Sequence, residues 1–240
     1  MTQTASAAAI PVQPFRPLEA LRAFGALMRN PEDTRQVFRV MAALRGRSGH
    51  RMFYRFVKSP VGAAVMADRR QLLDRLEDQD ALARLPEGSL GRAYLAFMQE
   101  QNLSAAGLVE ASQTEEAEKL GPDPTLFRSR MRDMHDLTHV LTGYGRDGLG
   151  EMCLLGFMYR QTGNRGGAFI ALMGMRNFPK GATDRAARKA VFEGFRHGSR
   201  PDWFPGLDWE SLLSEDLEAL RARLNVPAPA AYHAIAAQQS

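Results

Sequence analysis

Helical periodicity is the feature that most limits the fold of this 240-residue chain. Apolar residues recur at the three- and four-residue spacing of amphipathic helices along most of the sequence, and the alternating pattern of a half-buried strand is scarce. Proline and glycine signals at Asn30-Pro31, Ser59-Pro60 and Gly121-Pro122 divide this pattern into separate segments. We therefore expect an all-α fold, a bundle of many helices.

The breaks in the pattern also predict where the helices lie and how the chain is organised. The segments expected to be helical are 17–28, 31–44, 51–57, 61–67, 69–76, 90–99, 104–120, 126–142, 151–160, 168–175, 183–195 and 208–224. Residues 17–226 should form one helical domain, which could divide into two halves near the polar link at 77–88. The small, polar leader 1–16 and the Pro/Ala-rich tail 227–240 are expected to be disordered.

Composition excludes several classes of protein. A single cysteine, Cys153, rules out an intrachain disulfide framework and a zinc site made only of cysteines. The net charge of +4, without a dense basic stripe or a zinc-finger spacing, gives no reason to expect a nucleic-acid partner. The longest apolar stretch, 152–175, is interrupted by charged residues and is not expected to span a membrane. The leader has neither a secretory nor a mitochondrial targeting pattern, so we expect a cytoplasmic location in a bacterium.

One constellation carries the residue types of a metal centre. His135 and His139 are four residues apart, which places them one above the other on a helix, and Asp136 is turned by about 100° from His135 at 3.6 residues per turn. The three side chains share one arc of the helix, opposite an apolar arc that should face the core. If this arc is buried too, its polar groups need partners, and a metal ion would supply them.

Glu151 is the candidate for a fourth ligand. It stands at the start of an apolar segment after a loop rich in glycine, so it could fold back over the two histidines. It could equally be a favourable charge at a helix N-terminus. Two imidazoles and two carboxylates suit one divalent ion, with zinc first and iron, cobalt or manganese as alternatives.

Two other metal enzymes use related motifs. A zincin protease would need Glu rather than Asp beside the first histidine. A His-Asp phosphohydrolase acting on a prenyl phosphate shares the dipeptide His135-Asp136 but needs further ligands on other helices. His50 and Asp74 are the candidates for that role, although nothing in their spacing favours them.

Several motifs together resemble one known family, the coenzyme Q biosynthesis protein 4 family. His135-Asp136-x-x-His139, eleven residues and then Glu151 resemble its metal motif. The family's Leu-Pro-x-Gly-[Ser/Thr]-Leu-Gly-x-x-Tyr segment is similar to Leu85 to Tyr94, and its C-terminal segment is similar to Asp208-Trp209-Glu210 and 219–224. The resemblance covers most of residues 18–226, with three separated motifs in the same order and spacing. The leader and the tail match nothing in the family.

The resemblance implies a role in ubiquinone biosynthesis. It implies a helical protein that is peripheral on the inner membrane and takes an isoprenoid-tailed substrate. The expected reaction is metal-dependent removal of the C1 carboxylate of a polyprenylated, 4-hydroxybenzoate-derived precursor, in an oxidative form with hydroxylation. The ligands that it implies are His135, Asp136, His139 and Glu151. Other quinone-biosynthesis proteins are expected as partners, and the protein could form a homodimer.

We expect further residues to bind the substrate's head group and its isoprenoid tail. Arg132 lies about 60° from His135 around the helix and could pair with an anionic head group, or instead form a salt bridge to Asp136 or Glu151. The apolar helices after Glu151 would line a lipid groove for the polyprenyl tail, with the binding residues Phe157, Met158, Phe169 and Met173. The alternative is a non-catalytic lipid-binding scaffold that organises quinone-biosynthesis enzymes around a structural metal.

Overall fold

The computed structural model describes residues 10, 12–30, 33, 35–100, 120–177 and 182–237. Within these ranges the secondary structure is entirely helical apart from one isolated bridge between Ser89 and Asp216, which confirms the all-α prediction for this part of the chain. The helices before the gap at 101–119 are α1 (Pro17–Arg29), α2 (Arg35–Ala43), α3 (Ser48–Val57), α4 (Pro60–Asp68), α5 (Leu72–Glu77), α6 (Gln79–Ala83) and α7 (Leu90–Glu100). The helices after it are α9 (Pro122–Thr142), α10 (Gly148–Thr162), α11 (Arg165–Gly174), α12 (Ala182–His197), α13 (Trp209–Leu212), α14 (Leu217–Arg223) and α15 (Ala230–Ala236), with short 3-10 turns η1 (Met175–Asn177) and η2 (Phe204–Gly206).

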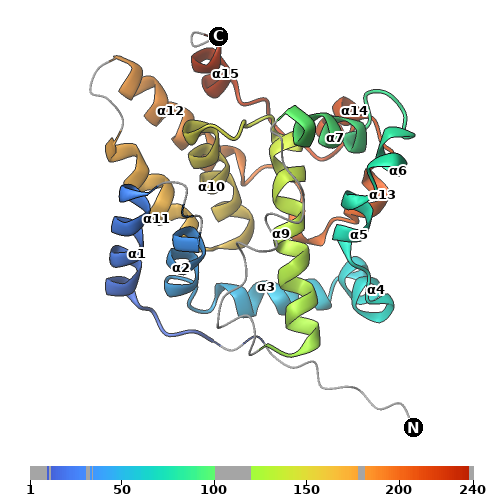
Figure 1. The fold of residues 1–240 in the computed structure, drawn as a ribbon, viewed down its shortest axis with the longest axis horizontal. Coiled ribbons are helices and arrows are strands. Elements are labelled where there is room, and N and C mark those ends of the chain that lie inside the picture. Colours follow the sequence, from blue (N-terminus) through green and yellow to red (C-terminus); the bar gives the residue numbers. More distant parts are fainter. Residues whose placement is uncertain are drawn as a thin grey trace.

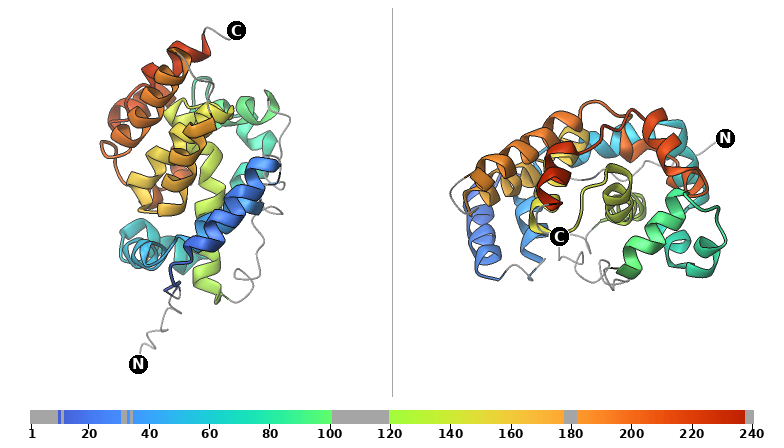
Figure 2. Two further views of the ribbon diagram at one scale, coloured as in Figure 1. Left: turned by 90° about the vertical axis from the view of Figure 1, so that its left-hand side faces the viewer. Right: turned by 90° about the horizontal axis from the view of Figure 1, so that it is seen from above.

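Helix α9 runs through the middle of the bundle (Figure 1). Seen from above, α10 to α12 and the first two helices lie on one side of it, and α5 to α7 with α13 and α14 lie on the other (Figure 2). Pro122 opens α9 in the first turn, where its missing N–H costs nothing, so the helix starts earlier than the predicted residue 126. Every residue from Asp136 to Thr142 is buried. Polar side chains on this stretch therefore need partners inside the protein.

In the described part of the chain, the apolar core consists of three clusters. The largest surrounds the second half of α9 and joins it to α5, α7, α10, α12 and the C-terminal helices, with Trp209 fully buried. A second cluster joins α1, α2 and α11, and a third joins α3 and α4 to the first turns of α9. Leu76 and Leu90, on either side of the predicted link at 77–88, both belong to the largest cluster.

The segment predicted as one helix at 208–224 is divided into α13 and α14. Between them the backbone pairs with the start of α7: the N–H of Leu90 donates to the Glu215 carbonyl and the N–H of Gly91 to the Leu213 carbonyl, at 2.9 and 2.8 Å. The Asp216 side chain then caps α14 by accepting from the Ala219 N–H. These non-local bonds, which local periodicity does not reveal, end the first helix.

The two ends of the chain differ from the disorder expected of them. Part of the leader lies outside the described residues, but Ile10 is buried against α3. In the segment 227–240, residues Ala230–Ala236 form α15, and Tyr232 and Ile235 are buried in the largest core. The predicted helix at 104–120 falls almost wholly outside the described residues.

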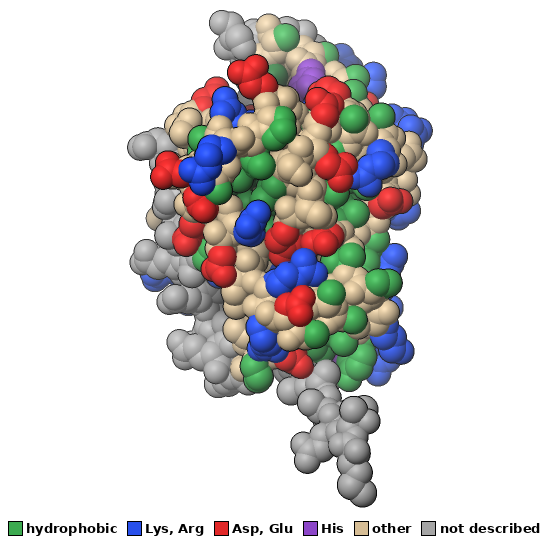
Figure 3. All heavy atoms as spheres, turned by 90° about the vertical axis from the view of Figure 1, so that its right-hand side faces the viewer, with side chains coloured by type: hydrophobic (Ala, Val, Ile, Leu, Met, Phe, Trp, Pro, Cys, Tyr) green, Lys and Arg blue, Asp and Glu red, His purple; other side chains and the backbone are tan. Residues whose placement is uncertain are grey.

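One face of the described surface carries charges of both signs. On the face formed by α4 to α7, α13 and α14, acidic and basic side chains are interspersed (Figure 3). Ion pairs on and between these helices include Arg70 with Asp208, at 3.1 Å, and Arg223 with Glu215. None of the described helices is both long enough and apolar enough to cross a membrane.

Candidate metal centre

The structure gathers the ligand atoms of His135, Asp136 and His139 within 4.8 Å of one another, an arrangement that could hold a metal ion. The two imidazole Nε2 atoms are 3.2 Å apart, and the rings stand at 90° to each other. Two nitrogens that bind one zinc ion at about 2.1 Å with a tetrahedral angle are separated by roughly 3.4 Å. The spacing of the histidines therefore fits a shared cation.

Glu151 lies in the first turn of α10, and its carboxylate lies beside the same two rings. Its Oε1 atom lies 3.4 Å from Nε2 of His139, and its Oε2 atom lies 3.8 Å from Nε2 of His135. The close approach of α10 to the preceding loop depends on Gly150, because a Cβ there would collide with the Gly145 carbonyl. The structure thus brings Glu151 beside both histidines, although the group of three whose ligand atoms all lie within 4.8 Å of one another does not include it. Binding of a metal by these four residues stays a prediction.

The His139 ring is oriented by two neighbours. Its Nδ1–H donates to the Tyr144 carbonyl at 2.9 Å, which leaves the lone pair of the neutral ring on Nε2, the atom that faces the cluster. Phe97 of α7 stacks on the same ring at a centroid distance of 5.8 Å. The ring is therefore oriented with Nε2, the atom that a metal would bind, towards the cluster.

Electrostatics at the cluster favour a cation. Burial would raise the pKa of Glu151, but the hydrogen bond and charge of the histidines outweigh it, and the pKa is lowered. Burial also opposes the charged form of His139, yet the hydrogen bond to Glu151 raises its pKa above the ordinary value. The pKa of His135 is lowered by burial and by the charge of His139. Two carboxylates beside imidazoles in a mostly buried site thus attract positive charge, and a divalent ion would fit this donor set.

Arg132 forms an ion pair with its chain neighbour Asp133. Its Nε atom donates to Oδ1 of Asp133 at 2.7 Å, and its Nη2 atom lies 2.6 Å from the same oxygen. Burial raises the pKa of Asp133, against the opposing effect of Arg132. A role for Arg132 at an anionic head group therefore requires the guanidinium to be shared with Asp133, and that role stays a prediction.

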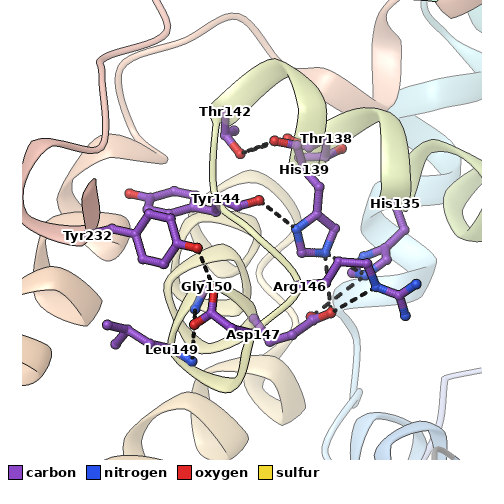
Figure 4. Close-up of polar contacts among 11 residues, drawn as sticks. His135, Thr138, His139, Thr142, Tyr144, Arg146, Asp147, Leu149, Gly150 and Tyr232 are labelled. Carbon is purple, nitrogen blue, oxygen red and sulfur yellow. Dashed lines mark hydrogen bonds and ion pairs between the residues drawn. The ribbon is translucent and has the colours of Figure 1, made fainter. Parts of the chain in front are cut away.

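Arg146 is the residue at the site that sequence reasoning missed. It lies in the loop between α9 and α10, and its Nε atom is 3.8 Å from Oε1 of Glu151 (Figure 4). Its side chain is 29% exposed, so the guanidinium stands at the solvent side of the cluster. The signal was present in the sequence as the one basic residue between the ligands His139 and Glu151.

The four residues predicted to bind a lipid tail belong to two core clusters. Phe157 is fully buried against Phe204, with ring centroids 5.2 Å apart, and Met158 packs on the same core. Phe169 and Met173 pack instead against the cluster of α1 and α2. The interior position of Phe157 is explained by core packing alone, and a lipid groove stays a proposal.

The candidate ligands of the phosphohydrolase alternative lie elsewhere. Nδ1 of His50 is 3.0 Å from the Ile10 carbonyl, and the ring packs against Tyr54. Within the described residues, the possible metal-holding group contains neither His50 nor Asp74. The structure therefore adds nothing in favour of that enzyme class.

Comparison with known sequences shows extensive similarity. The family model described as Coenzyme Q (ubiquinone) biosynthesis protein Coq4 matches residues 9–230. The mitochondrial ubiquinone biosynthesis protein COQ4 of Yarrowia lipolytica is 27% identical over 177 residues, which are 72% of this chain and 64% of that protein. The human mitochondrial COQ4 homologue is 26% identical over 194 residues, which are 79% of this chain and 71% of that protein. The match thus spans less than two thirds of the yeast protein.

Among solved structures, the crystal structure of a proposed ubiquinone biosynthesis protein from Nostoc punctiforme has the same fold. It matches with a TM-score of 0.66 and 22% sequence identity. The match covers 90% of this chain and all of the Nostoc chain. The helical arrangement described above therefore also occurs in a solved structure.

Proposed function

The chain belongs to the Coenzyme Q (ubiquinone) biosynthesis protein Coq4 family, and from this premise we propose that it acts in ubiquinone biosynthesis as a metal-dependent decarboxylase. The substrate would be a polyprenylated, 4-hydroxybenzoate-derived precursor, and the group removed would be its C1 carboxylate. The ligands would be His135, Asp136, His139 and Glu151, with zinc as the first candidate ion.

The observation that carries this proposal is the uneven burial of the cluster. The His139 side chain is fully buried, whereas the His135 and Glu151 side chains are each 31% exposed. A structural metal site is closed by protein ligands, and a catalytic one keeps a position open. The exposed side of this cluster, where Arg146 also lies, supports an open position that a substrate can reach.

The reaction breaks the bond between C1 and the carboxylate carbon, so CO₂ leaves and its electron pair stays on the ring. In the simple form a proton replaces CO₂ at C1. In the oxidative form a hydroxyl replaces it: dioxygen takes up the two electrons of the broken bond, and with one water as co-reactant the products are the phenol, CO₂ and hydrogen peroxide. When bound, the divalent ion would act as a Lewis acid that stabilises negative charge on the substrate oxygens. The protein contributes the oriented His139 ring and the carboxylates that hold the cation in place.

Arg146 is the residue that we assign to the substrate's carboxylate. Its guanidinium is half-buried beside Glu151 on the exposed side of the cluster, and a guanidinium can hold a carboxylate through two parallel hydrogen bonds. Arg132 is a second candidate, but its guanidinium already pairs with Asp133. Arg146→Gln should therefore raise KM by about tenfold, the size expected for loss of a charged hydrogen bond, whereas Arg132→Gln should have the smaller effect.

The isoprenoid tail and the membrane complete the proposed setting. A long apolar tail would bring the substrate to the protein at a membrane surface, and no described helix crosses that membrane. We propose a peripheral position on the bacterial inner membrane, next to other quinone-biosynthesis proteins. The apolar side chains Phe169 and Met173, which are only partly buried, are the better candidates for tail contact, because Phe157 is enclosed in the core.

A decarboxylation assay with a prenylated 4-hydroxybenzoate derivative tests the proposal. The unaltered protein loaded with metal should release CO₂, and His139→Ala should abolish both metal binding and turnover. His50→Ala is the matched control, since it removes an imidazole that bonds to Ile10 outside the cluster. A strain that carries only His139→Ala and still makes normal amounts of quinone would overturn the catalytic assignment.

The scaffold alternative has its own outcome in the same assay. A protein that binds one metal ion and an isoprenoid lipid but releases no CO₂, alone or with its partner proteins, would fit a non-catalytic module. Release of inorganic phosphate from a prenyl phosphate would instead favour the phosphohydrolase reading.

A further inference from the structure

The C-terminal helix α15 packs against the loop that connects two of the predicted ligands, His139 and Glu151. In the fold it lies at the same end of the molecule as this loop (Figure 1), and Tyr232 points into the loop (Figure 4). The approach is close, because a Cβ on Gly145 would collide with the Tyr232 hydroxyl. The segment was expected to be a disordered tail, but it forms a helix that contacts the loop between the two predicted ligands.

Tyr232 is connected to Glu151 through the start of α10. Its hydroxyl donates to Oδ2 of Asp147, and Oδ1 of Asp147 accepts from the N–H groups of Leu149 and Gly150 at 3.0 and 3.1 Å. Asp147 is therefore the N-cap of α10, and its second carboxylate oxygen is held by α15. Because Glu151 stands in the first turn of α10, the Asp147 cap fixes the direction in which its carboxylate leaves the helix.

His233 is connected to His139 through the end of α9. Its Nε2 atom donates to the Gly143 carbonyl at 3.0 Å, and the Gly143 N–H donates to the His139 carbonyl at 2.8 Å. Gly143 has a φ of 77°, the left-handed conformation in which glycine ends a helix. The next residue, Tyr144, supplies the carbonyl that orients the His139 ring. The edge of the Tyr144 ring also meets Tyr232, at a centroid distance of 5.8 Å.

Helix α15 is itself held by the body of the protein. The N–H of Ala231 donates to Oε1 of Glu193 on α12 at 3.0 Å, and Ile235 is buried in the largest core. Pro229 lies against Gly143, within ordinary contact distance of a Cβ at that position. Because α15 is anchored on α12 and in the core, its contacts hold the loop in a fixed position relative to α12.

We propose that Tyr232 and His233 are positioning residues for the metal centre, which hold the loop 143–150 so that His139 and Glu151 face one cation. The proposal rests on the proposed metal function and adds residues that the family match does not include, since that match ends at residue 230. The two residues act through Asp147 and Gly143 and touch neither the cation nor the substrate. Groups that hydrogen-bond directly to a metal ligand typically change metal affinity by 10- to 100-fold, and these two residues act one contact further out, so we expect effects at the lower end of that range.

The test measures metal affinity in the full-length protein by competition with a chelator. Tyr232→Phe keeps the ring that packs on Tyr144 and removes only the hydroxyl; His233→Ala removes the second tie. We expect each variant to weaken Zn²⁺ binding by about tenfold and the double variant by more. Tyr159→Phe is the matched control, because it removes a hydroxyl from α10 at a ring that packs on Phe195, and it should leave the affinity unchanged.

A spectroscopic readout separates positioning from general stability. With Co²⁺ in place of Zn²⁺, the visible absorption spectrum reports the coordination geometry, so it should change in Tyr232→Phe and stay the same in Tyr159→Phe. A Zn²⁺ affinity within twofold of the parent, with an unchanged Co²⁺ spectrum, would overturn the positioning role.

Failure of the metal function itself has a different signature. If the unaltered protein binds neither Zn²⁺ nor Co²⁺, the proposed function fails. Hydrogen exchange of the backbone amides of residues 143–151 then tests whether α15 holds this loop in place. Exchange at least tenfold faster in Tyr232→Phe than in Tyr159→Phe would show that α15 fixes this loop. Equal exchange in the two variants would show that it does not.

Discussion

Helix α9 contributes to two charged clusters that lie little more than one turn apart and satisfy their charges in different ways. One is enclosed around Arg130, and the other is exposed on the side of His135 and Glu151. Arg130 forms a bidentate pair with Glu210 of α13, with Nη1–Oε1 and Nη2–Oε2 distances of 2.6 and 2.7 Å, and also donates to the Leu207 carbonyl. The second cluster places the carboxylates of Asp136 and Glu151 beside two imidazoles. The first cluster is neutral by itself. In the second, two carboxylates face two imidazoles and the single guanidinium of Arg146, so its charge balance depends on protonation of the histidines or on a bound cation.

The difference separates a structural use of buried charge from a functional one. A buried ion pair with good geometry neutralises both partners and ties two helices together, here α9 and α13. A buried group of carboxylates without an equal number of cations is costly unless a proton or a metal ion joins it. The comparison therefore predicts that damage to the first cluster lowers stability and that damage to the second changes metal binding.

The largest effect on stability should follow from breaking the ion pair. Arg130→Met leaves Glu210 buried without its partner and should lower the free energy of unfolding by about 3–5 kcal/mol, as measured by urea denaturation. The double variant Arg130→Met/Glu210→Leu replaces both charges and should recover most of that loss. If the double variant is as unstable as the sum of the two single variants, the pair is not the self-contained unit described here.

Removal of metal should have the next largest effect, and it should act only on the second cluster. The parent protein at a free metal concentration of 100 times Kd should be more stable than the chelated protein by about 2.7 kcal/mol. Thermal unfolding with and without chelator measures this difference. It should disappear in Glu151→Gln and persist in Arg130→Met, and a difference that persists in Glu151→Gln would remove Glu151 from the ligand set.

Lowering the pH should weaken the first cluster through Glu210. Burial alone would raise the pKa of Glu210, but the hydrogen bonds and charge of Arg130 lower it below the ordinary 4.5. A carboxyl with a lowered pKa adds stability above its unfolded pKa and loses it as pH falls through the folded pKa. The free energy of unfolding should therefore fall below about pH 4.5, and it should fall less steeply in Glu210→Gln. Parallel pH profiles would contradict this assignment.

The smallest effect should come from a side chain that belongs to neither cluster. Leu18 on α1 is 69% exposed, so Leu18→Gln should change the free energy of unfolding by no more than about 0.5 kcal/mol. Metal affinity should stay the same in this variant. If Leu18→Gln lowers the free energy of unfolding by more than 1 kcal/mol, it cannot serve as the control against which the variants of the two clusters are compared.

The sequence predicted the parts of this structure that depend on local spacing. The histidine pair on one arc of α9 follows from helical geometry, and a return of Glu151 follows from the glycine-rich loop. Most helices also lie close to their predicted bounds, because apolar periodicity records which face of a helix is buried. The starts of several helices were placed too late, most of all that of α9, where Pro122 opens the helix rather than marking a stop.

The parts that sequence reasoning missed depend on contacts between distant segments. The split between α13 and α14 arises from backbone bonds to the start of α7, and α15 is helical because it docks on α12 and the metal loop. The ion pair of Arg132 with Asp133 is likewise one choice among nearby carboxylates that helical spacing does not settle. Such choices are made by tertiary packing.

Native mass spectrometry of the purified protein tests the central claim most directly, because it counts bound metal ions and co-purified lipid in the folded chain. The account predicts one divalent ion in the parent, retained in Arg130→Met and lost in His139→Ala, together with an isoprenoid ligand. A parent protein that is folded but free of metal, or a His139→Ala variant that still holds one ion, would contradict it.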